Sequence, residues 1–421
     1  MKFLISLVGA CALQTLVSAI PAFPGAEGFG ANAVGGREGG TVHVVTNLED
    51  KGAGSLRDAV SGKNRIVVFA VGGLINIKER IVVSERVTIL GQTAPGDGIS
   101  VYGNGWSFSN ADNTIIRYVR IRMGKVGTGK KDCVGIAEGD NMIFDHLSVT
   151  WGRDETFSIN GPVNNITIQN SIIGQGLETH SAGGLIQSDG GISLFRNLYI
   201  DNKTRNPKVK GTNDFTNNVV YNWGGGGGYI AGGDSSGSSN VNIIGNFFIS
   251  GPSTSATAFT RGNEGFKGFV DGNFYDSDKD GTLNGVLLSA ESANFGGMSI
   301  APTRFDYPAP AKILTAQEAL DLAFESVGTS LARDSVDKQL IDEVKSFGKV
   351  GELISDENAS PMNGPGTIAP GTVAIDTDGD GIPDAEETKL GTDPNVADSM
   401  TIAANGYTNL ENWANSLVPA S

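Results

Sequence analysis

Apolar and polar residues alternate in short runs between residues 87 and 275, a pattern typical of strands. Glycine, asparagine or aspartate borders each run, as expected of the turns between strands. The first apolar residues of successive runs lie 28, 28, 23, 26, 23, 26 and 28 residues apart, a mean of 26. These residues are Val87, Ile115, Ile143, Ile166, Ile192, Phe215, Val241 and Phe269.

This period predicts a solenoid with one coil per repeat. A propeller blade needs four strands in about 40–45 residues, so these units are too short for one. A β-sandwich gives no reason for so even a spacing. We therefore expect an all-β chain folded as a right-handed single-stranded parallel β-helix. Asparagines recur inside the runs, and we expect their amides to bond along the axis where turns stack; they are Asn170, Asn197, Asn218, Asn246 and Asn273.

The two ends of the chain differ from this repeat. Residues 1–19 combine one lysine, an apolar stretch and the small-x-small ending Val17-Ser18-Ala19, which predicts a signal peptide and secretion into the extracellular space. The β-helix domain is expected over 20–312, where a short helix and strands near residues 53–76 begin or cap it.

Helical periodicity follows the repeat. A helical extension is predicted over 313–355, where Thr315 and Glu318 have capping-box spacing. Residues 356–371 are rich in proline, glycine, serine and asparagine and predict a linker. Residues 372–421 are expected to form a small EF-hand-like calcium-loop module.

The charge balance restricts the partners. The 421 residues carry a net charge of −15, which argues against nucleic acid. An anionic ligand would need a local basic patch or a bound cation. No run beyond the N-terminus approaches the roughly 20 apolar residues that span a bilayer, so no membrane partner is expected. Removal of the signal peptide leaves Cys133 alone, which predicts a buried structural thiol and no internal disulfide.

A calcium loop is the most specific motif in the chain. In "DTDGDGIPDAEE", residues 376–387, acids occupy positions 1, 3, 5, 9 and 12 and Gly381 occupies position 6. This spacing wraps hard oxygen donors around one calcium ion, with a backbone carbonyl at position 7. The predicted ligands are Asp376, Asp378, Asp380, Ile382, Asp384 and Glu387.

A second loop, "DSDKDGTLNGVL" at 276–287, matches less well because position 12 is Leu287. A calcium loop of lower affinity and a surface turn both remain open for it. Its candidate ligands are Asp276, Asp278, Asp280 and the carbonyl of Thr282.

Positive charge is concentrated in "NKTRNPKVKG", residues 202–211, and acids in the segment 141–159. Residues one coil apart in a solenoid are stacked neighbours, so Asp145 and Asp154 are expected on one external face with Arg205. Carboxylates beside a basic cluster suit calcium together with an anionic sugar. A structural role for Asp145, bonded to backbone groups, is the alternative.

The motifs "FDHLSVTWG…DE" and "TRNPKVKG" together resemble the pectate lyases of polysaccharide lyase family 1, over roughly residues 22–300. The resemblance implies a calcium-dependent enzyme that cleaves α-1,4-linked polygalacturonate by β-elimination in plant cell-wall pectin. It implies Arg205 as the base and Lys208 and Lys210 as substrate-binding residues. It also implies calcium bound by Asp145, Asp154 and Glu155.

Other functions fit less of the sequence. A glycoside hydrolase needs two opposed carboxylates, but Asp154 and Glu155 are adjacent and point to opposite faces of a strand. A calcium-independent pectin lyase and a non-catalytic calcium-binding β-helix that binds carbohydrate remain the alternatives. The chain is expected to be a monomer. Three sequons are candidate glycosylation sites: Asn165, Asn202 and Asn358.

Overall fold

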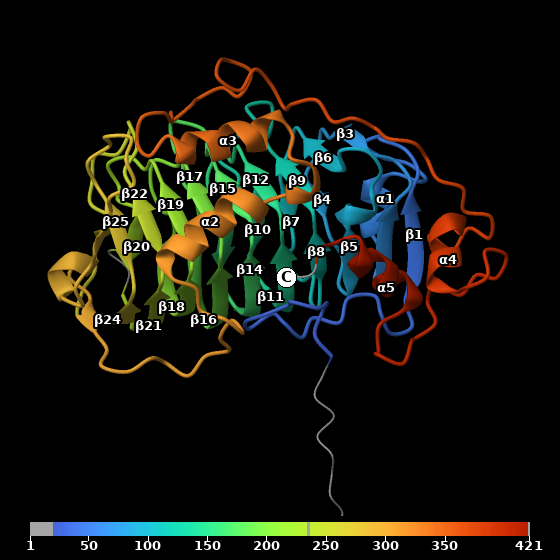
Figure 1. Ribbon diagram of the computed structural model, residues 1–421, viewed down its shortest axis with the longest axis horizontal. Coiled ribbons are helices and arrows are strands. Elements are labelled where there is room, and N and C mark those ends of the chain that lie inside the picture. Colours follow the sequence, from blue (N-terminus) through green and yellow to red (C-terminus); the bar gives the residue numbers. More distant parts are fainter. Residues whose placement is uncertain (1–19, 234–235, 420–421) are drawn as a thin grey trace, which may run out of the picture.

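The computed structural model describes residues 20–233 and 236–419, so the predicted signal peptide, residues 1–19, lies outside the described residues. The chain winds into a parallel β-solenoid of about 9 turns, which confirms the predicted parallel β-helix (Figure 1). Most strands pair with the strands one coil before and one coil after them, in parallel and with matched register.

The described coils contribute strands to three stacks. The first stack contains β4 (Ile81–Val82), β7 (Trp106–Ser107), β10 (Val134–Ile136), β13 (Phe157–Asn160), β16 (Leu185–Phe195), β18 (Lys208–Thr216), β20 (Tyr229–Ala231) and β23 (Phe259–Thr260). The second contains β1 (Thr41–Val45), β2 (Arg65–Phe69), β5 (Val87–Leu90), β8 (Ile115–Arg117), β11 (Gly139–Asp145), β14 (Val163–Gln169), the later parts of β16 and β18, β21 (Ser239–Ile244), β24 (Phe266–Asp271) and β27 (Ser299–Ile300).

The third stack forms a separate sheet. It contains β3 (Gly73–Asn76), β6 (Ile99–Tyr102), β9 (Val119–Arg122), β12 (Ser148–Thr150), β15 (Ile172–Gly174), β17 (Leu198–Ile200), β19 (Val219–Tyr221), β22 (Phe247–Ile249) and β25 (Phe274–Asp276), with β26 (Val286–Leu287) antiparallel at its edge. Strands β16 and β18 belong to both other stacks because they continue across the corner between them.

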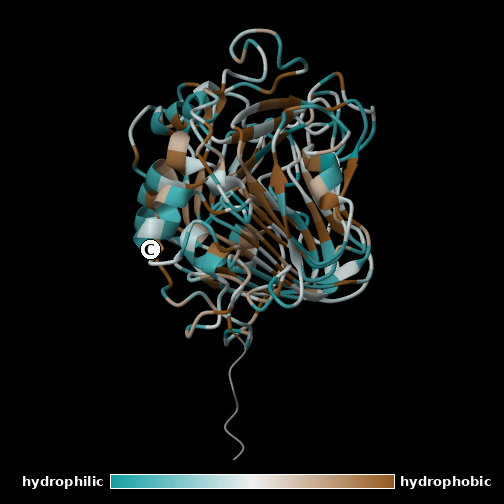
Figure 2. Cartoon of the chain, turned by 90° about the vertical axis from the view of Figure 1, so that its right-hand side faces the viewer, coloured by the Kyte–Doolittle hydropathy of each residue, from teal (hydrophilic) through white to brown (hydrophobic). Residues whose placement is uncertain are grey.

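The core lies inside the coils, where alternate residues of every strand meet. Figure 2, viewed along the solenoid from the β1 end, shows hydrophobic residues gathered on this inner side. Aromatic rings stack from coil to coil: Phe144 lies 5.0 Å from Phe108 and 5.1 Å from Phe157, both edge to face. Cys133 is fully buried in the same core and donates to the carbonyl of Ile121, as predicted for a structural thiol.

An asparagine ladder runs along the corner between the second and third stacks. The Nδ2 of Asn197 donates to Asn218 (3.1 Å), that of Asn218 to Asn246 (3.2 Å), and that of Asn246 to Asn273 (2.8 Å). Each of these four amides also donates to a backbone carbonyl, for example Asn218 to Leu194. The prediction of axial amide bonds is confirmed for these four residues.

The helices lie outside the solenoid. Helices α2 (Ala316–Ser326) and α3 (Ser335–Lys345) pack on the third stack, and the predicted capping box at Thr315 and Glu318 is present. The other helical elements are α1 (Leu56–Val60), η1 (Gly91–Thr93), η2 (Ser292–Phe295), η3 (Ser330–Ala332), α4 (Asp384–Leu390) and α5 (Asn409–Ser416). Both α4 and α5 lie at the β1 end (Figure 1).

The segment 356–371, predicted as a linker, is tied to the solenoid. Glu357 is fully buried and accepts from the hydroxyl of Tyr102 (2.6 Å) and from the backbone N–H of Lys125 (2.9 Å). Figure 1 shows this stretch running along the outside from α3 towards α4.

The ladder predicts a large effect of a small deletion. We expect Asn218→Ala to lower the free energy of unfolding by about 2–3 kcal/mol, because it leaves buried groups of Asn197 and Asn246 without partners. Urea denaturation measures this. Asn240→Ala, at a half-buried position of β21 outside the ladder, is the control, and equal losses for the two variants would contradict the ladder's role.

Candidate functional site

Equivalent positions of four coils line up just before the strands of the first stack. The backbone N–H of Cys133 donates to Glu155 (2.9 Å), Thr156 to Ala182 (2.8 Å), and Gly183 to Thr204 (3.0 Å). Because each bond joins one coil to the next, the residues beside these positions also stack. They bring together Asp132, Asp154, Glu155, His180 and Arg205.

Direct contacts hold this cluster together. The guanidinium of Arg205 forms an ion pair with Glu155. The Nε2 of His180 lies 3.0 Å from Asp154 and 4.0 Å from Glu155. Asp132 accepts a bond from the backbone N–H of Glu155 (3.2 Å). The structure therefore places the predicted Asp154, Glu155 and Arg205 in one site.

The electrostatics of the site are unusual for both signs of charge. Burial and the nearby charge of Asp154 raise the pKa of Asp132 to about 6. Burial also lowers the pKa of Arg205, and the charge of Arg261 acts in the same direction. Two carboxylates that repel each other favour a bound cation between them, while the lowered pKa makes Arg205 a better proton acceptor than an ordinary arginine.

The predicted substrate-binding lysines continue the line from Arg205 along β18. Val209 is buried, so Lys208 and Lys210 on either side of it point outward, and both are half-buried. Their stems lie over the next coil: the Nζ of Lys208 is 3.2 Å from where a Cβ on Gly233 would be, and that of Lys210 is 3.6 Å from the equivalent point on Gly237. Glycine at these two positions leaves room for the lysines.

Asp145 does not belong to this site, which corrects the expectation of one shared external face. It is fully buried at the end of β11 and forms an ion pair with Arg117 (2.8 Å). Its other oxygen accepts from Gln169 (2.9 Å) and Asn170 (3.0 Å). The alternation of β11 turns this side chain away from the site, so the structural alternative describes it.

Sequence reasoning missed three members of the site: Asp132, His180 and Arg261. The repeat itself could have identified Asp132, because it precedes Glu155 by 23 residues, which is one of the observed coil lengths. The arginine and histidine follow no such simple spacing, since the turns between these strands differ in length.

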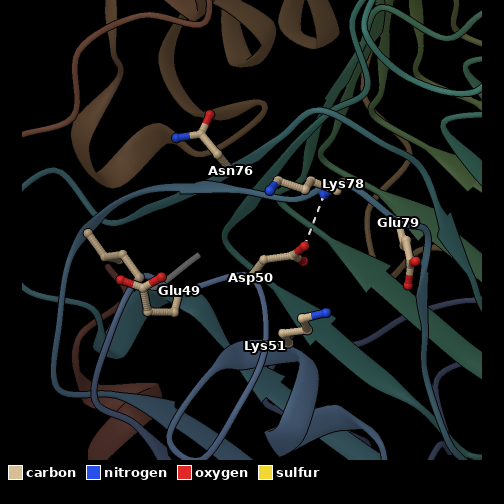
Figure 3. Close-up of a pocket in the computed structure, with 7 residues that line it drawn as sticks. Glu49, Asp50, Lys51, Asn76, Lys78 and Glu79 are labelled. Atoms are coloured by element: carbon tan, nitrogen blue, oxygen red, sulfur yellow. Dashed lines mark hydrogen bonds between the residues drawn. The ribbon is translucent and has the colours of Figure 1, made fainter.

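A cavity of ≈ 480 Å³ adjoins Asp132 along the first stack, and Arg80, Lys131, Ser158 and Asn160 are among its lining residues. A second cavity of ≈ 480 Å³ lies at the β3 end of the molecule (Figure 3). Its Asp50 is already engaged by Arg57 (2.5 Å) and by the backbone N–H of Lys78 (3.1 Å). Only the first cavity joins the clustered acids and bases.

The two predicted calcium loops differ in the structure. Asp376, Asp378 and Asp380 converge, with ligand oxygens within 4.8 Å of one another, and Asp380 also converges with Glu387 and Asp398. Ile382 contributes a fully buried side chain.

Asp384 does not join these groups. Its carboxylate accepts from the N–H and the hydroxyl of Thr377, both at 2.7 Å, so it caps the loop instead of facing its centre. The structure thereby separates Asp384 from the acids predicted to share its ligand sphere.

In the second loop, Asp276, Asp278 and Asp280 do not form a converging group among the described residues. The side chain of Asn284 donates to Asp278 (2.9 Å), and the N–H of Thr282 donates to Asp280 (2.6 Å). These bonds are those of a surface turn.

One predicted glycosylation site is excluded by burial. Asn202 is fully buried, and its amide donates to Ile173 (3.1 Å) and Asn206 (2.9 Å), so a glycan has no room there in the folded chain. Asn165 is half-buried and Asn358 is exposed, and both stay predictions.

Comparison with known proteins gives consistent matches. The chain is 67% identical over 421 residues to a probable pectate lyase C of Aspergillus flavus, covering 100% of both chains. It is 68% identical over 418 residues to the protein of that name from Aspergillus terreus, covering 99% of this chain and 98% of the other.

Solved structures agree on the fold. A thermostable pectate lyase matches with a TM-score of 0.53 at 15% identity, covering 72% of this chain and 97% of that one. A pectate lyase bound to a hexasaccharide matches with a TM-score of 0.52 at 14% identity, covering 74% and 98%. Residues 376–397 match the family model described as a bacterial TSP3 repeat. In the described part of the chain, helices of the length and apolar character needed to cross a membrane are absent.

The reassignment of Asp145 predicts a stability effect without a calcium effect. Burial opposes its ionisation, but His146 and Arg117 hold its pKa well below the usual range. The stability it contributes is therefore present above the pKa of an unfolded aspartate and is lost as the pH falls. We expect Asp145→Asn to lower the free energy of unfolding by about 3–5 kcal/mol at neutral pH, because Arg117 loses its buried partner.

Thermal unfolding between acid and neutral pH measures this effect. The loss should shrink as the pH falls, since protonation weakens the wild-type ion pair as well. Asp154→Asn, at a half-exposed position, is the control and should leave stability nearly unchanged. A weakened response to calcium in Asp145→Asn, with unchanged stability, would restore Asp145 as a ligand.

Proposed function

The chain belongs to the pectate lyase family, and from this we propose that it cleaves α-1,4-linked polygalacturonate by calcium-assisted β-elimination, releasing unsaturated oligogalacturonides. The observation that carries the proposal is the convergence of Arg205, Lys208 and Lys210 with the acids Asp132 and Asp154 along one edge of the first stack. A polyanion and a divalent cation are the ligands that such an edge suits.

The difficult step in this reaction is removal of the C5 proton, which is acidic because it is α to the uronate carboxylate. We assign the proton acceptor to Arg205. An ordinary guanidinium stays protonated, but burial and the charge of Arg261 both favour the neutral form of this one. The half-exposed position of Arg205, with 27% of its side chain accessible, leaves it open to substrate.

The lysines supply the attraction that an acidic protein otherwise lacks. Lys208 and Lys210 project from the same strand that follows Arg205, so they would bind uronate carboxylates on neighbouring sugars. The net charge of −15 repels a polyanion at long range, and these residues reverse the field locally. Orientation of the substrate by several such contacts brings the C5 proton to Arg205.

Calcium fits the donor set of this site. Asp132 and Asp154 offer hard carboxylate oxygens close enough that the charge of Asp154 raises the pKa of Asp132. Together with Glu155 they would hold the ion, whereas the nitrogen of His180 is a poor calcium ligand and would orient Asp154. Bound calcium would withdraw charge from the uronate carboxylate and so make the C5 proton more acidic.

We further propose that the protein is secreted by means of residues 1–19, acts as a monomer, and degrades pectin in plant cell walls. The sequence supports secretion through the small-x-small ending of this segment. Retention of the full-length chain inside an expressing fungal cell would contradict it.

Replacement of the proposed base tests the mechanism directly. We expect Arg205→Ala to reduce kcat on polygalacturonate by roughly 10²–10⁴-fold, the usual contribution of a general base. The ultraviolet absorbance of the unsaturated product measures the rate.

Arg304→Ala is the matched control, because Arg304 has 28% of its side chain accessible and pairs with a buried acid, Asp214. Assayed well below its unfolding temperature, it should retain activity. Equal activity of Arg205→Ala and wild type would refute the base assignment, and reducing ends without absorbance would indicate hydrolysis instead.

Removal of calcium tests the second half of the proposal. We expect a chelator to abolish activity on polygalacturonate, and Asp132→Asn to raise the calcium concentration for half-maximal activity roughly tenfold or more. Excess calcium should restore most of the rate of the variant. Activity that survives chelation on highly methylated pectin would favour the pectin lyase alternative, and binding without any product would favour a carbohydrate-binding protein.

A further inference from the structure

We propose that the C-terminal module, residues 372–419, holds a calcium ion outside the catalytic site, and that this ion fastens the module onto the first coils of the solenoid. The ligands are carboxylates from the loop 376–387 together with one from beyond it. They are Asp376, Asp378, Asp380, Glu387 and Asp398.

The geometry brings these acids to one point from two directions. Asp376, Asp378 and Asp380 form one group, and Asp380, Glu387 and Asp398 form another, each with ligand atoms within 4.8 Å of one another. Asp380 belongs to both groups and is 7% exposed. Asp398 lies outside the twelve-residue spacing and takes the place that the spacing gave to Asp384.

The clearest indication of a ligand is Glu387. Its side chain is fully buried, and neither of its carboxylate oxygens has a hydrogen-bond partner in the described chain. One oxygen of Asp378 is also buried without a partner. Burial of an unpaired carboxylate is strongly unfavourable. Among the ion pairs of the described residues, none joins a lysine, arginine or histidine to Glu387, Asp380 or Asp398.

A divalent cation with a preference for oxygen resolves this conflict. Calcium accepts six to eight oxygen ligands and tolerates irregular geometry. The oxygens that face other directions are already satisfied: the backbone N–H groups of Ile382, Asp398 and Ser399 donate to Asp380. These bonds hold Asp380 in place, whereas the two oxygens of Glu387 remain for the ion.

The loop is also the surface by which the module contacts the solenoid. Ile382 packs in one buried cluster with Ile66, Val68, Leu410 and Trp413. The backbone at Gly381 lies so close to β1 and β2 that an added Cβ would be 2.8 Å from Val42 and 3.1 Å from Val68. A cation that orders this loop therefore also orders the contact with the first two strands of the second stack.

The far side of the module is attached independently. Asn409, at the start of α5, donates to the carboxylate of Asp398 (3.0 Å). Glu411 of the same helix forms a buried ion pair with Arg37, at 2.9 Å, just before β1. The ion thus joins the loop, the Asp398 segment and α5 at the end of the solenoid, where β1 has a partner strand on one side only. Capping of such an end is a general requirement of solenoid folds.

Thermal unfolding of the full chain tests the proposal through an effect of opposite sign in two conditions. In chelator, Glu387→Gln should unfold at the same temperature as wild type or higher, because it removes an unpaired buried charge. In calcium, it should unfold at a lower temperature than wild type, because it has lost a ligand. Glu386→Gln, on the same helix with an exposed ion pair to Lys389, should follow wild type in both conditions.

Calcium titration by calorimetry supplies a second measurement, carried out in the Asp154→Asn chain so that the catalytic site does not contribute. We expect one binding event that Glu387→Gln or Asp398→Asn weakens roughly tenfold or more. If Glu387→Gln does not fold, Asp398→Asn provides the same comparison. A calcium-induced shift in these variants equal to that of wild type would overturn the proposal.

The outcome is separable from the proposed lyase activity. Glu387→Gln should keep its rate on polygalacturonate at saturating calcium and low temperature. Loss of lyase activity in all chains, with the calcium stabilisation intact, would reject the catalytic assignment and leave the module site standing. The converse result would reject the module site alone.

Discussion

Hydrogen bonding between successive coils is the constraint on which the rest of the structure depends. It fixes each residue beside the residue one coil later, so side chains in corresponding positions become neighbours along the axis. Asn197, Asn218, Asn246 and Asn273 form one ladder for this reason. The same register places Asp132 beside Glu155 and carries the line on to Arg205, so the core and the site are consequences of one repeat.

This constraint also explains which predictions from the sequence succeeded. The strands, the parallel coils, the asparagine ladder and the capped helix at Thr315 all follow from local pattern and spacing, and the structure confirms them. Asp145 and Asn202 were misplaced because sequence spacing does not reveal which way a side chain turns at the corner between two stacks. Asp132 was missed although the repeat contained it, since the period was applied to the strands and not to the residues before them.

Opposite charges are distributed so that an acidic protein can receive an acidic polymer. Most acids lie away from the basic line formed by Arg205, Lys208 and Lys210, and several are already neutralised by structural arginines. Arg122, for example, pairs with Asp334 and Asp337 where α3 packs on β9. Such pairs fasten the outer helices to the solenoid. They also leave the local field at the site to the unpaired lysines and the acids proposed to bind calcium, with a polyanion attracted only where the cations gather.

The partners of a buried carboxylate, more than its burial, separate structural acids from ligands in this protein. Asp145 is buried with an arginine, so its pKa is held low and its charge is complete without a metal. Asp201 is buried against Glu343, and burial together with that neighbour raises its pKa well above the usual value, which a single proton shared by the two acids satisfies. Glu387 has neither an arginine nor a donor, and it lies among three or more carboxylates that one proton cannot neutralise. Only a multivalent cation meets the last condition, and the acids at Asp132 and Asp154 approach it as well, which is why the same ion is expected at two sites that differ in purpose.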